Sequence, residues 1–291
     1  MANASENYTI GRWGGVFRTE YLSDQPVAKC PHCGRPLRPV RRWFGNTLIY
    51  EGPEECDCEG ARKERERRMQ AWEEKIQQRA RKRIREAYIR DLIRKSRLGK
   101  RFRLRTFDTF DRNRQPKAYS VARAYAEHFA EHKAKGEGLL FLGPVGTGKT
   151  HLAAAIANYL LDRGVPVIFG TLATLFENLR ASLYADGATE AEREEARREL
   201  YDVDLLVLDD LGKERLTPWA VEELYSLLNY RYENMLPVVI TTNLSLAQLR
   251  ERYDAERTQA GQAIVSRITE MCRVVIIKGD DYRLMMRKNG R

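Results

Sequence analysis

The sequence predicts an α/β fold in which helices cover both faces of an open five-stranded parallel sheet, preceded by a small cysteine-rich module and a basic helical linker. From about residue 106 onward, short apolar runs alternate with helical stretches, which is typical of parallel strands joined by helical crossovers. Residues 1–60 hold four of the five cysteines and many Gly, Pro and aromatic residues. So short a module cannot bury enough apolar surface alone and is expected to need a metal.

Several classes of protein are excluded by length and composition. A length of 291 residues suits about two domains. No run approaches the roughly 18 consecutive apolar residues of a membrane helix, and the N-terminus lacks the basic and apolar segments of a secretory signal. We therefore expect a cytoplasmic protein whose cysteines serve as metal ligands or free thiols rather than as a disulfide scaffold.

The positive charge is concentrated in one segment. The sequence divides into a module at 1–60, a linker at 61–105 and a main domain at 106–291, and the linker holds 19 basic against 6 acidic residues. Residues 61–98 contain no Pro or Gly, and their apolar positions recur every three or four residues, which predicts a charged helix with a thin apolar stripe. Such a basic belt suits phosphate groups or an acidic protein face, and a solvated linker is the alternative.

The main domain is expected to alternate strands and helices throughout. The predicted strands are 139–142, 165–169, 205–208, 238–242 and 274–277, and the predicted helices are 149–163, 171–184, 189–201, 217–234, 245–253 and 261–271.

The segment 143–150 reads GPVGTGKT and lies between a predicted strand and a predicted helix, the context that identifies a P-loop. Its backbone N–H groups and the helix N-terminus favour bound phosphate. We expect Lys149 to reach the β- and γ-phosphates and the Thr150 hydroxyl to hold Mg²⁺. The residues predicted to bind ATP are Gly143, Pro144, Val145, Gly146, Thr147, Gly148, Lys149, Thr150 and His151.

Polar side chains follow two further predicted strands. Asp209 and Asp210 end the run 205–208, so we expect Asp209 to hold Mg²⁺ and Asp210 to orient or deprotonate the attacking water. The alternative is that one of them caps the next turn. Asn243 follows the strand 238–242 and is predicted to reach the γ-phosphate or the lytic water, with a plain helix N-cap as the alternative.

Together these segments resemble the AAA+ ATPases and, within them, bacterial replicative helicase loaders of the DnaC/DnaI type. The resemblance covers roughly residues 100–283. It rests on GPVGTGKTHLA (143–153), LLVLDDLG (205–212), ITTNLS (240–245), AIVSRITEMC (263–272) and KGDDYR (278–283). It implies an AAA+ P-loop domain with Mg²⁺-dependent ATPase activity.

The resemblance also implies roles for two arginines and one helical hairpin. Arg267 matches the arginine finger that acts on a neighbouring subunit, and Arg283 matches the second sensor arginine, although Asp281 stands where the family usually has Ser. Either arginine could instead form a surface ion pair. The stretch 171–201 resembles an extra helix directed at single-stranded DNA, so Arg180 and Tyr184 are candidate DNA contacts; packing of Tyr184 in the core is the alternative.

The cysteines of the N-terminal module form two pairs. Cys30 and Cys33 have Cys-x-x-Cys spacing, and Cys56 and Cys58 follow with Cys-x-Cys spacing. We predict one tetrahedral Zn²⁺ on the four thiolates, which would be structural because no coordination position is left open. His32 is the alternative to Cys58 as fourth ligand, and a redox Cys-x-x-Cys is the alternative to zinc.

The leading hypothesis is an ATP-dependent loader that places a hexameric DnaB-type replicative helicase on single-stranded DNA. As the resemblance implies, the zinc module would dock on the helicase, and the AAA+ domains would associate with one another. The first alternative is an IstB-like transposition ATPase that acts on duplex DNA with a transposase. The second is a zinc-stapled adaptor that binds nucleotide with little turnover.

Overall fold

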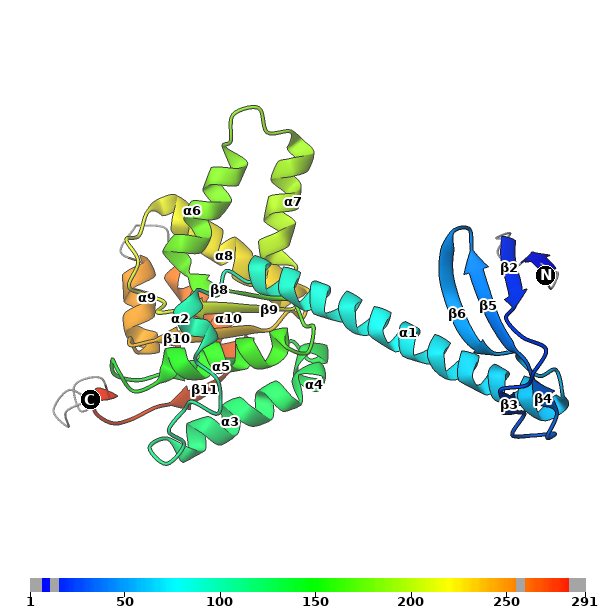
Figure 1. Ribbon diagram of the computed structural model, residues 1–291. Helices are drawn as coiled ribbons and strands as arrows, with labels where there is room; N and C mark the ends of the chain where they lie inside the picture. The colour runs from blue at the N-terminus through cyan, green and yellow to red at the C-terminus, as the bar shows by residue number, and fades with distance from the viewer. Residues whose placement is uncertain (1–6, 11–15, 255–259, 283–291) are drawn as a thin grey trace. The chain divides into compact units, whose positions relative to one another are not determined.

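The computed structural model describes residues 7–10, 16–254 and 260–282 (Figure 1). The chain divides into two compact units, residues 1–83 and residues 84–291. The division falls within one long helix, α1 (Glu59–Lys95), so the predicted linker 61–105 is not a separate body: its last part belongs with the second unit. Among the described residues, no helix is both long and apolar enough to cross a membrane.

The first unit is mainly a small antiparallel sheet. Its strands, in the order β1-β2-β5-β6, are β1 (Asn7–Ile10), β2 (Val16–Tyr21), β5 (Pro39–Phe44) and β6 (Thr47–Pro53), and a separate two-stranded ribbon pairs β3 (Ala28–Lys29) with β4 (Pro36–Leu37). The module was expected from the sequence, but these strands were not. Its buried centre consists of Cys30, Leu37 and Cys56, a core too small to leave a clear hydrophobic pattern in the sequence.

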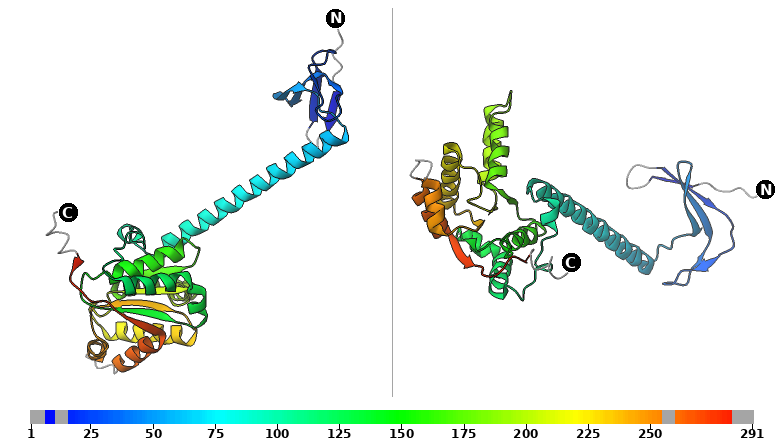
Figure 2. Two further views of the ribbon diagram at one scale, coloured as in Figure 1. Left: turned by 90° about the horizontal axis from the view of Figure 1, so that it is seen from below. Right: turned by 90° about the vertical axis from the view of Figure 1, so that its left-hand side faces the viewer.

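The second unit contains the predicted five-stranded parallel sheet (Figures 1 and 2). Its strands run in the order β11-β7-β10-β9-β8, and neighbouring strands pair in parallel. Their bounds are β7 (Gly138–Leu142), β8 (Val167–Thr171), β9 (Leu205–Asp209), β10 (Val238–Thr242) and β11 (Cys272–Ile276).

Helices cover both faces of this sheet. Alternate residues of each strand point to opposite sides: Leu139 and Phe141 of β7 join one core cluster, and Leu140 joins the other. The first cluster includes residues of α3 (Pro116–Glu127), α4 (Phe129–Ala134) and α5 (Lys149–Leu161), beside the short α2 (Lys100–Arg103). The second includes residues of α6 (Leu172–Leu183), α7 (Glu190–Tyr201), α8 (Pro218–Glu233), α9 (Leu246–Asp254) and α10 (Gly261–Met271). The predicted layer arrangement is therefore confirmed.

Two strands begin two residues away from their predicted starts. β8 begins two residues later than expected, because a turn with Gly164 at a φ of 85° and the fixed ring of Pro166 precede the ladder. β11 begins two residues earlier, since Cys272 pairs with Gly138 directly after α10. Helix α3 was not predicted. Its buried face is mostly alanine, which gives a weak periodic signal.

The sheet order places three functional segments at one edge. β7, β10 and β9 are neighbours and run in the same direction, so their carboxyl ends lie side by side. This edge is where open α/β sheets bind ligands. The segments that leave it are the glycine-rich loop after β7, Asn243 after β10, and the aspartate pair at the end of β9.

Candidate functional site

The glycine-rich loop connects β7 to α5 in the conformation of a phosphate cradle. Gly146 and Gly148 have φ angles of 77° and 102°, which only glycine adopts at little cost. Gly148 is the N-cap of α5, so the helix N-terminus, with its partial positive charge, faces the loop. The geometry fits an anion such as a nucleotide phosphate.

Lys149 lies at the centre of the cradle, where its side chain is buried. Its ammonium group donates to the carbonyl oxygens of Gly143 and Pro144, both at 2.7 Å, and to Oδ1 of Asn243 at 2.6 Å. Buried ammonium groups need such partners. Lys149 and Asn243 were predicted independently of each other, and the structure brings them into direct contact beyond the carboxyl ends of the neighbouring strands β7 and β10.

Asn243 does not cap the helix that follows it. The side-chain oxygen of Ser245 accepts from the N–H of Gln248, and Gln248 Oε1 accepts from the N–H of Ser245, so the reciprocal cap at the start of α9 belongs to Ser245. The Asn243 amide oxygen is instead directed to Lys149. The contact supports the predicted placement of Asn243 at the phosphate cradle over the helix-cap alternative.

Asp209 is a buried carboxyl at the end of β9. Burial raises its pKa above the usual value, while hydrogen bonds from the hydroxyls of Thr241 and Thr150 oppose this shift. The Thr150 hydroxyl and the Asp209 carboxylate are hard oxygen ligands of the kind that Mg²⁺ prefers. A cation held by these two groups would also offset the desolvation of Asp209, so the residues present fit Mg²⁺.

Asp210 has an unusual backbone and an exposed charge partner. Its φ of 55° lies in the left-handed region, where non-glycine residues are uncommon. Its N–H donates to Thr241 Oγ1 at 2.8 Å, and its carboxylate lies 2.9 Å from the ammonium of Lys213. Because Thr241 Oγ1 also donates to Asp209 Oδ1 at 2.7 Å, one hydroxyl on β10 fixes both aspartates.

The aromatic rings of Phe110 and His151 pack beside the glycine-rich loop. The ring of Phe110 would come within 2.9 Å of a Cβ atom on Gly148 and packs edge-on against His151, with ring centroids 5.1 Å apart. His151 Nε2 lies 3.0 Å from the carbonyl oxygen of Thr106, and burial lowers the pKa of its imidazole. Phe110 was not among the predicted site residues, although the pattern TFDTF at 106–110 was a usable signal.

Of the two predicted arginines, only Arg267 lies within the described residues. Arg267 Nε donates to Asn229 Oδ1 at 3.0 Å, its Nη1 lies 3.9 Å from Glu270 Oε2, and its guanidinium carbon lies 4.2 Å from the centre of the Tyr232 ring. These contacts hold the partly exposed guanidinium against α8 of its own chain. Arg283 lies outside the described residues.

The hairpin of α6 and α7 carries the candidate DNA contacts. Tyr184, the C-cap of α6, is 69% exposed, so it does not pack in the core. The guanidinium of Arg180 lies 5.9 Å from the centre of the Trp219 ring. Six acidic side chains of this hairpin are exposed to solvent. Four of them line a shallow surface pocket (Asp186, Glu192, Glu195 and Glu199), and Glu190 and Glu194 lie on the same helix, α7. The acidic surroundings weaken the electrostatic attraction for DNA, and the two contacts stay a prediction.

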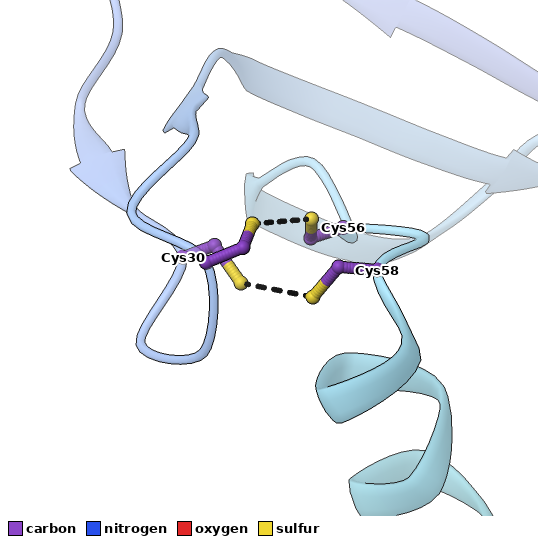
Figure 3. Close-up of side chains that lie close together, drawn as sticks. Cys30, Cys56 and Cys58 are labelled. Atoms are coloured by element: carbon purple, nitrogen blue, oxygen red, sulfur yellow. Dashed lines mark hydrogen bonds between the residues drawn. The ribbon is translucent and has the colours of Figure 1, made fainter.

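The four predicted zinc ligands lie together in the first unit (Figure 3). Their sulfur atoms all lie within 4.8 Å of one another, with Cys30 Sγ 3.8 Å from Cys58 Sγ and Cys33 Sγ 3.5 Å from Cys56 Sγ. Thiolates at zinc bond distance in a tetrahedron are about 3.8 Å apart. The cluster therefore fits a Zn²⁺ ion, and Cys58 rather than the exposed His32 completes it.

Backbone groups around the cluster favour thiolates. N–H groups of His32 and Cys33 lower the pKa of the Cys30 thiol to about 6. The N–H of Ala61, in the first turn of α1, donates to Cys58 Sγ at 3.5 Å. Cys33 differs: the N–H of Arg35 lowers its pKa, but the neighbouring thiols of Cys56, Cys58 and Cys30, together with burial, raise it to about 11. Since zinc binds thiolate rather than thiol, a bound zinc ion would remove this mutual opposition among the sulfurs.

Comparisons with known proteins agree with this geometry. The model of the family described as "IstB-like ATP binding protein" matches residues 65–290. XkdC, a protein of the phage-like element PBSX of Bacillus subtilis (strain 168), is 31% identical over 218 residues, which are 70% of this chain and 76% of XkdC.

Two further similarities point to helicase-loader proteins. The replicative helicase loader DnaC of Escherichia coli (strain K12) is 33% identical over 135 residues, which are 46% of this chain and 53% of DnaC. The match thus spans about half of DnaC. The crystal structure of DnaI aligns at 27% identity with a TM-score of 0.53 and covers 64% of this chain and 94% of that chain.

Proposed function

Because this chain belongs to the family of IstB-like ATP-binding proteins, we propose that it is a cytoplasmic, ATP-dependent loader of a DnaB-type replicative helicase onto single-stranded DNA. One observation carries the proposal. An ATP-binding unit similar to the loader DnaC follows, in the same chain, a separate module with a four-cysteine cluster. A nucleotide-driven adaptor needs these two parts, one to sense ATP and one to hold a partner.

The residues of the second unit support ATP binding and hydrolysis. The P-loop amides and Lys149 would hold the phosphates, and Thr150 with Asp209 would hold Mg²⁺, which neutralises developing phosphate charge when bound. Asp210 is at the correct strand end to orient the attacking water. Asn243 contacts Lys149, so it is positioned to respond when a phosphate competes for the same ammonium group.

Hydrolysis would be completed by a neighbouring copy. Arg267 contacts α8 and its neighbour Glu270 rather than the phosphate cradle of its own chain, an arrangement that supports a role in trans. In this proposal, ATP holds the domains in a row on the helicase ring, which stays open for single-stranded DNA. Loss of the γ-phosphate removes the group that Arg267 would contact, so hydrolysis weakens the assembly.

The first unit would dock on the helicase. Its cysteine cluster lacks an open coordination position when four thiolates hold zinc, so the metal would organise a binding module rather than perform chemistry. Several apolar side chains of its β5–β6 hairpin are exposed: Phe44, Leu48, Ile49 and Tyr50. Exposed apolar side chains that cluster on a small domain are typical of a protein interface.

Native mass spectrometry with the hexameric DnaB-type helicase of the same organism tests the proposal. In Mg²⁺-ATP we expect a complex that contains the helicase hexamer, several copies of this chain and one zinc ion per copy. We expect Lys149→Ala, which leaves the first unit intact, to retain helicase contact but lose the ATP-dependent copies. Absence of any complex with the wild-type chain would overturn the loader function.

The family match favours one second candidate, an IstB-like ATPase that acts on duplex DNA with a transposase. The two functions differ in what stimulates ATP hydrolysis. A loader is expected to respond to single-stranded DNA and helicase, whereas the alternative is expected to respond to duplex DNA and to ignore the helicase. Comparison of ATPase rates with each nucleic acid, with and without helicase, separates them.

A further inference from the structure

The chain beyond β11 lies along the P-loop as a strap. The strap comprises residues 277–282, which Figure 1 shows in red just after β11. At its start, the N–H of Ile277 donates to the carbonyl oxygen of Leu142 at 2.7 Å, and at its end the N–H of Tyr282 donates to the carbonyl oxygen of Gly146 at 3.0 Å. The strap is therefore hydrogen-bonded to both ends of the first half of the loop.

Two side chains from outside the strap hold it further. Gln115 Nε2 donates to the carbonyl oxygen of Lys278 at 2.5 Å. The guanidinium carbon of Arg114 lies 4.8 Å from the centre of the Tyr282 ring, within the range of a cation–π contact. The residues just before α3 thus fix the position of the strap over the nucleotide side of the sheet.

This arrangement places a carboxylate against the cradle. A Cβ atom on Gly146 would lie 2.0 Å from Oδ1 and 2.7 Å from Oδ2 of Asp281. Both oxygens therefore pack directly on the Cα atom of Gly146, and only glycine allows so close an approach. Asp281 is partly buried in this position, whereas its neighbour Asp280 is exposed.

A carboxylate at this place is expected to disfavour the binding of phosphate by the loop. The P-loop concentrates N–H groups and a helix N-terminus to attract negative phosphate. The Asp281 carboxylate has the same sign of charge as the phosphates and lies partly buried against Gly146 of the loop, where charges are screened less than in water. Each phosphate charge that enters the cradle therefore meets a repulsion that a neutral residue at position 281 would not exert.

We propose that Asp281 is an affinity-determining residue that keeps the phosphate cradle in a weak-binding state and disfavours the more highly charged nucleotide. This inference rests on the nucleotide-binding role proposed above. It follows that neutral substitution strengthens binding of ATP more than binding of ADP, because ATP carries the additional phosphate charge.

Isothermal titration calorimetry with ATP and with ADP, each in Mg²⁺ buffer, tests the inference on the full-length chain. We expect Asp281→Asn to lower the Kd for ATP about three- to tenfold, the effect of removing one partly screened charge, and to lower the Kd for ADP less. The conservative variant Asp281→Glu should bind ATP as weakly as the wild type. Asp280→Asn, the matched control on the exposed neighbour, should change either Kd less than about twofold.

The salt dependence of ATP affinity separates charge repulsion by Asp281 from a purely structural role of this residue, because a structural role would not depend on ionic strength. The ratio of the wild-type Kd to that of Asp281→Asn should shrink between low and high ionic strength, because mobile ions screen the repulsion. Equal or weaker ATP binding by Asp281→Asn, with a wild-type chain that binds ATP, would overturn this inference and leave the proposed function intact. If neither chain bound ATP, both the inference and the proposed ATPase function would fail.

Discussion

Five residues from three separate segments form the polar centre of the candidate nucleotide site. Thr241 uses one hydroxyl to donate to Asp209 and to accept from the backbone of Asp210. Lys149 and Asn243, 94 positions apart, share a hydrogen bond of 2.6 Å. The Thr241 contacts join the neighbouring strands β10 and β9, and the Lys149–Asn243 contact joins the start of α5 to the residue after β10, so the position of these candidate site groups depends on the register of the sheet. Small changes on β10 are therefore expected to affect both Asp209, the proposed metal ligand, and Asp210, the proposed water-orienting carboxylate.

Arg267 is the residue proposed to act on the nucleotide of a neighbouring subunit. We expect Arg267→Ala to bind ATP as the wild type does but to lose assembly-stimulated hydrolysis by on the order of 10³-fold, since an arginine finger stabilises charge in the transition state. ATPase assays with helicase and single-stranded DNA, together with ATP titrations of the isolated chain, measure the two quantities.

Asn229→Ala is the matched control for Arg267. It removes the hydrogen bond to Arg267 Nε but leaves the guanidinium available to a neighbouring subunit. If Arg267 served only to hold α10 against α8, Asn229→Ala would reproduce much of the loss. Full assembly-stimulated hydrolysis in Arg267→Ala would show that the finger assignment is wrong.

At the scale of single elements, the cysteine cluster and the first turns of α1 depend on each other. Arg65 of α1 donates through Nη1 to the carbonyl oxygen of Cys56 at 2.8 Å and through Nη2 to Asp57 Oδ1 at 3.2 Å. The N–H of Ala61 contacts Cys58 Sγ. The loop that carries the second cysteine pair is thus built onto the start of the helix, and a metal bound there would order both.

The element-scale prediction concerns zinc. We expect one zinc ion per purified chain, and we expect chelation or Cys58→Ser to release it and to open residues 16–60 to proteases, because the buried centre of the first unit is too small to persist alone. Metal analysis and limited proteolysis follow the two effects, and the second unit should survive digestion.

Two variants serve as controls for the zinc prediction. Cys272 is buried in the second unit, so Cys272→Ser should retain a full zinc content. His32→Ala should also retain zinc, since Cys58 is the residue within the sulfur cluster. Loss of zinc in His32→Ala with retention in Cys58→Ser would reverse the ligand assignment.

At the scale of the whole molecule, helix α1 connects the two units and carries most of the excess positive charge. Residues 61–105 hold 19 basic and 6 acidic residues, and the described side chains from position 66 to position 88 are exposed. Exposed apolar side chains recur along the same helix at Met69, Trp72, Ile76, Ile84 and Tyr88. A helix so exposed and so charged suits a negatively charged partner better than the interior of this chain.

The whole-molecule prediction concerns salt. Affinity for single-stranded DNA, or for the helicase, should fall steeply between 50 and 200 mM salt, at concentrations of the kind that reveal phosphate contacts. Replacement of Arg79, Arg81 and Arg85 by Gln should reduce the slope of log K against log salt by about 2 if all three contact phosphates, at about 0.7 per contact. Fluorescence anisotropy with labelled oligonucleotide measures this.

A charge-matched variant tests whether the salt dependence comes from the basic segment 61–105 or from the overall positive charge of the chain. Arg193, Arg197 and Arg198 of α7 each lie within 4 Å of a glutamate, so their replacement by Gln should leave the slope unchanged. If the affinity of the wild-type chain did not change with salt, segment 61–105 would be a solvated linker without phosphate contacts.

Much of this protein could be predicted from sequence because the signals are local. The P-loop is defined within eight residues by glycines that permit its turns and by the helix that follows. Four of the five strands are apolar runs that are mostly buried, while the edge strand β11 is half exposed. The cysteine pairs have the close spacing of metal ligands. Each of these features depends on neighbours in the chain, so the order of residues was enough to indicate an α/β ATP-binding fold and a four-sulfur site.

Tertiary structure alone decided which side chains meet. The contact of Lys149 with Asn243, the bridge of Thr241 between two aspartates, and the approach of Asp281 to Gly146 join segments whose separation in space is set by the strand order β11-β7-β10-β9-β8. The antiparallel sheet of the first unit was missed for a related reason. Its strands bury few side chains, so pairing between strands, rather than hydrophobic periodicity, determines where they lie.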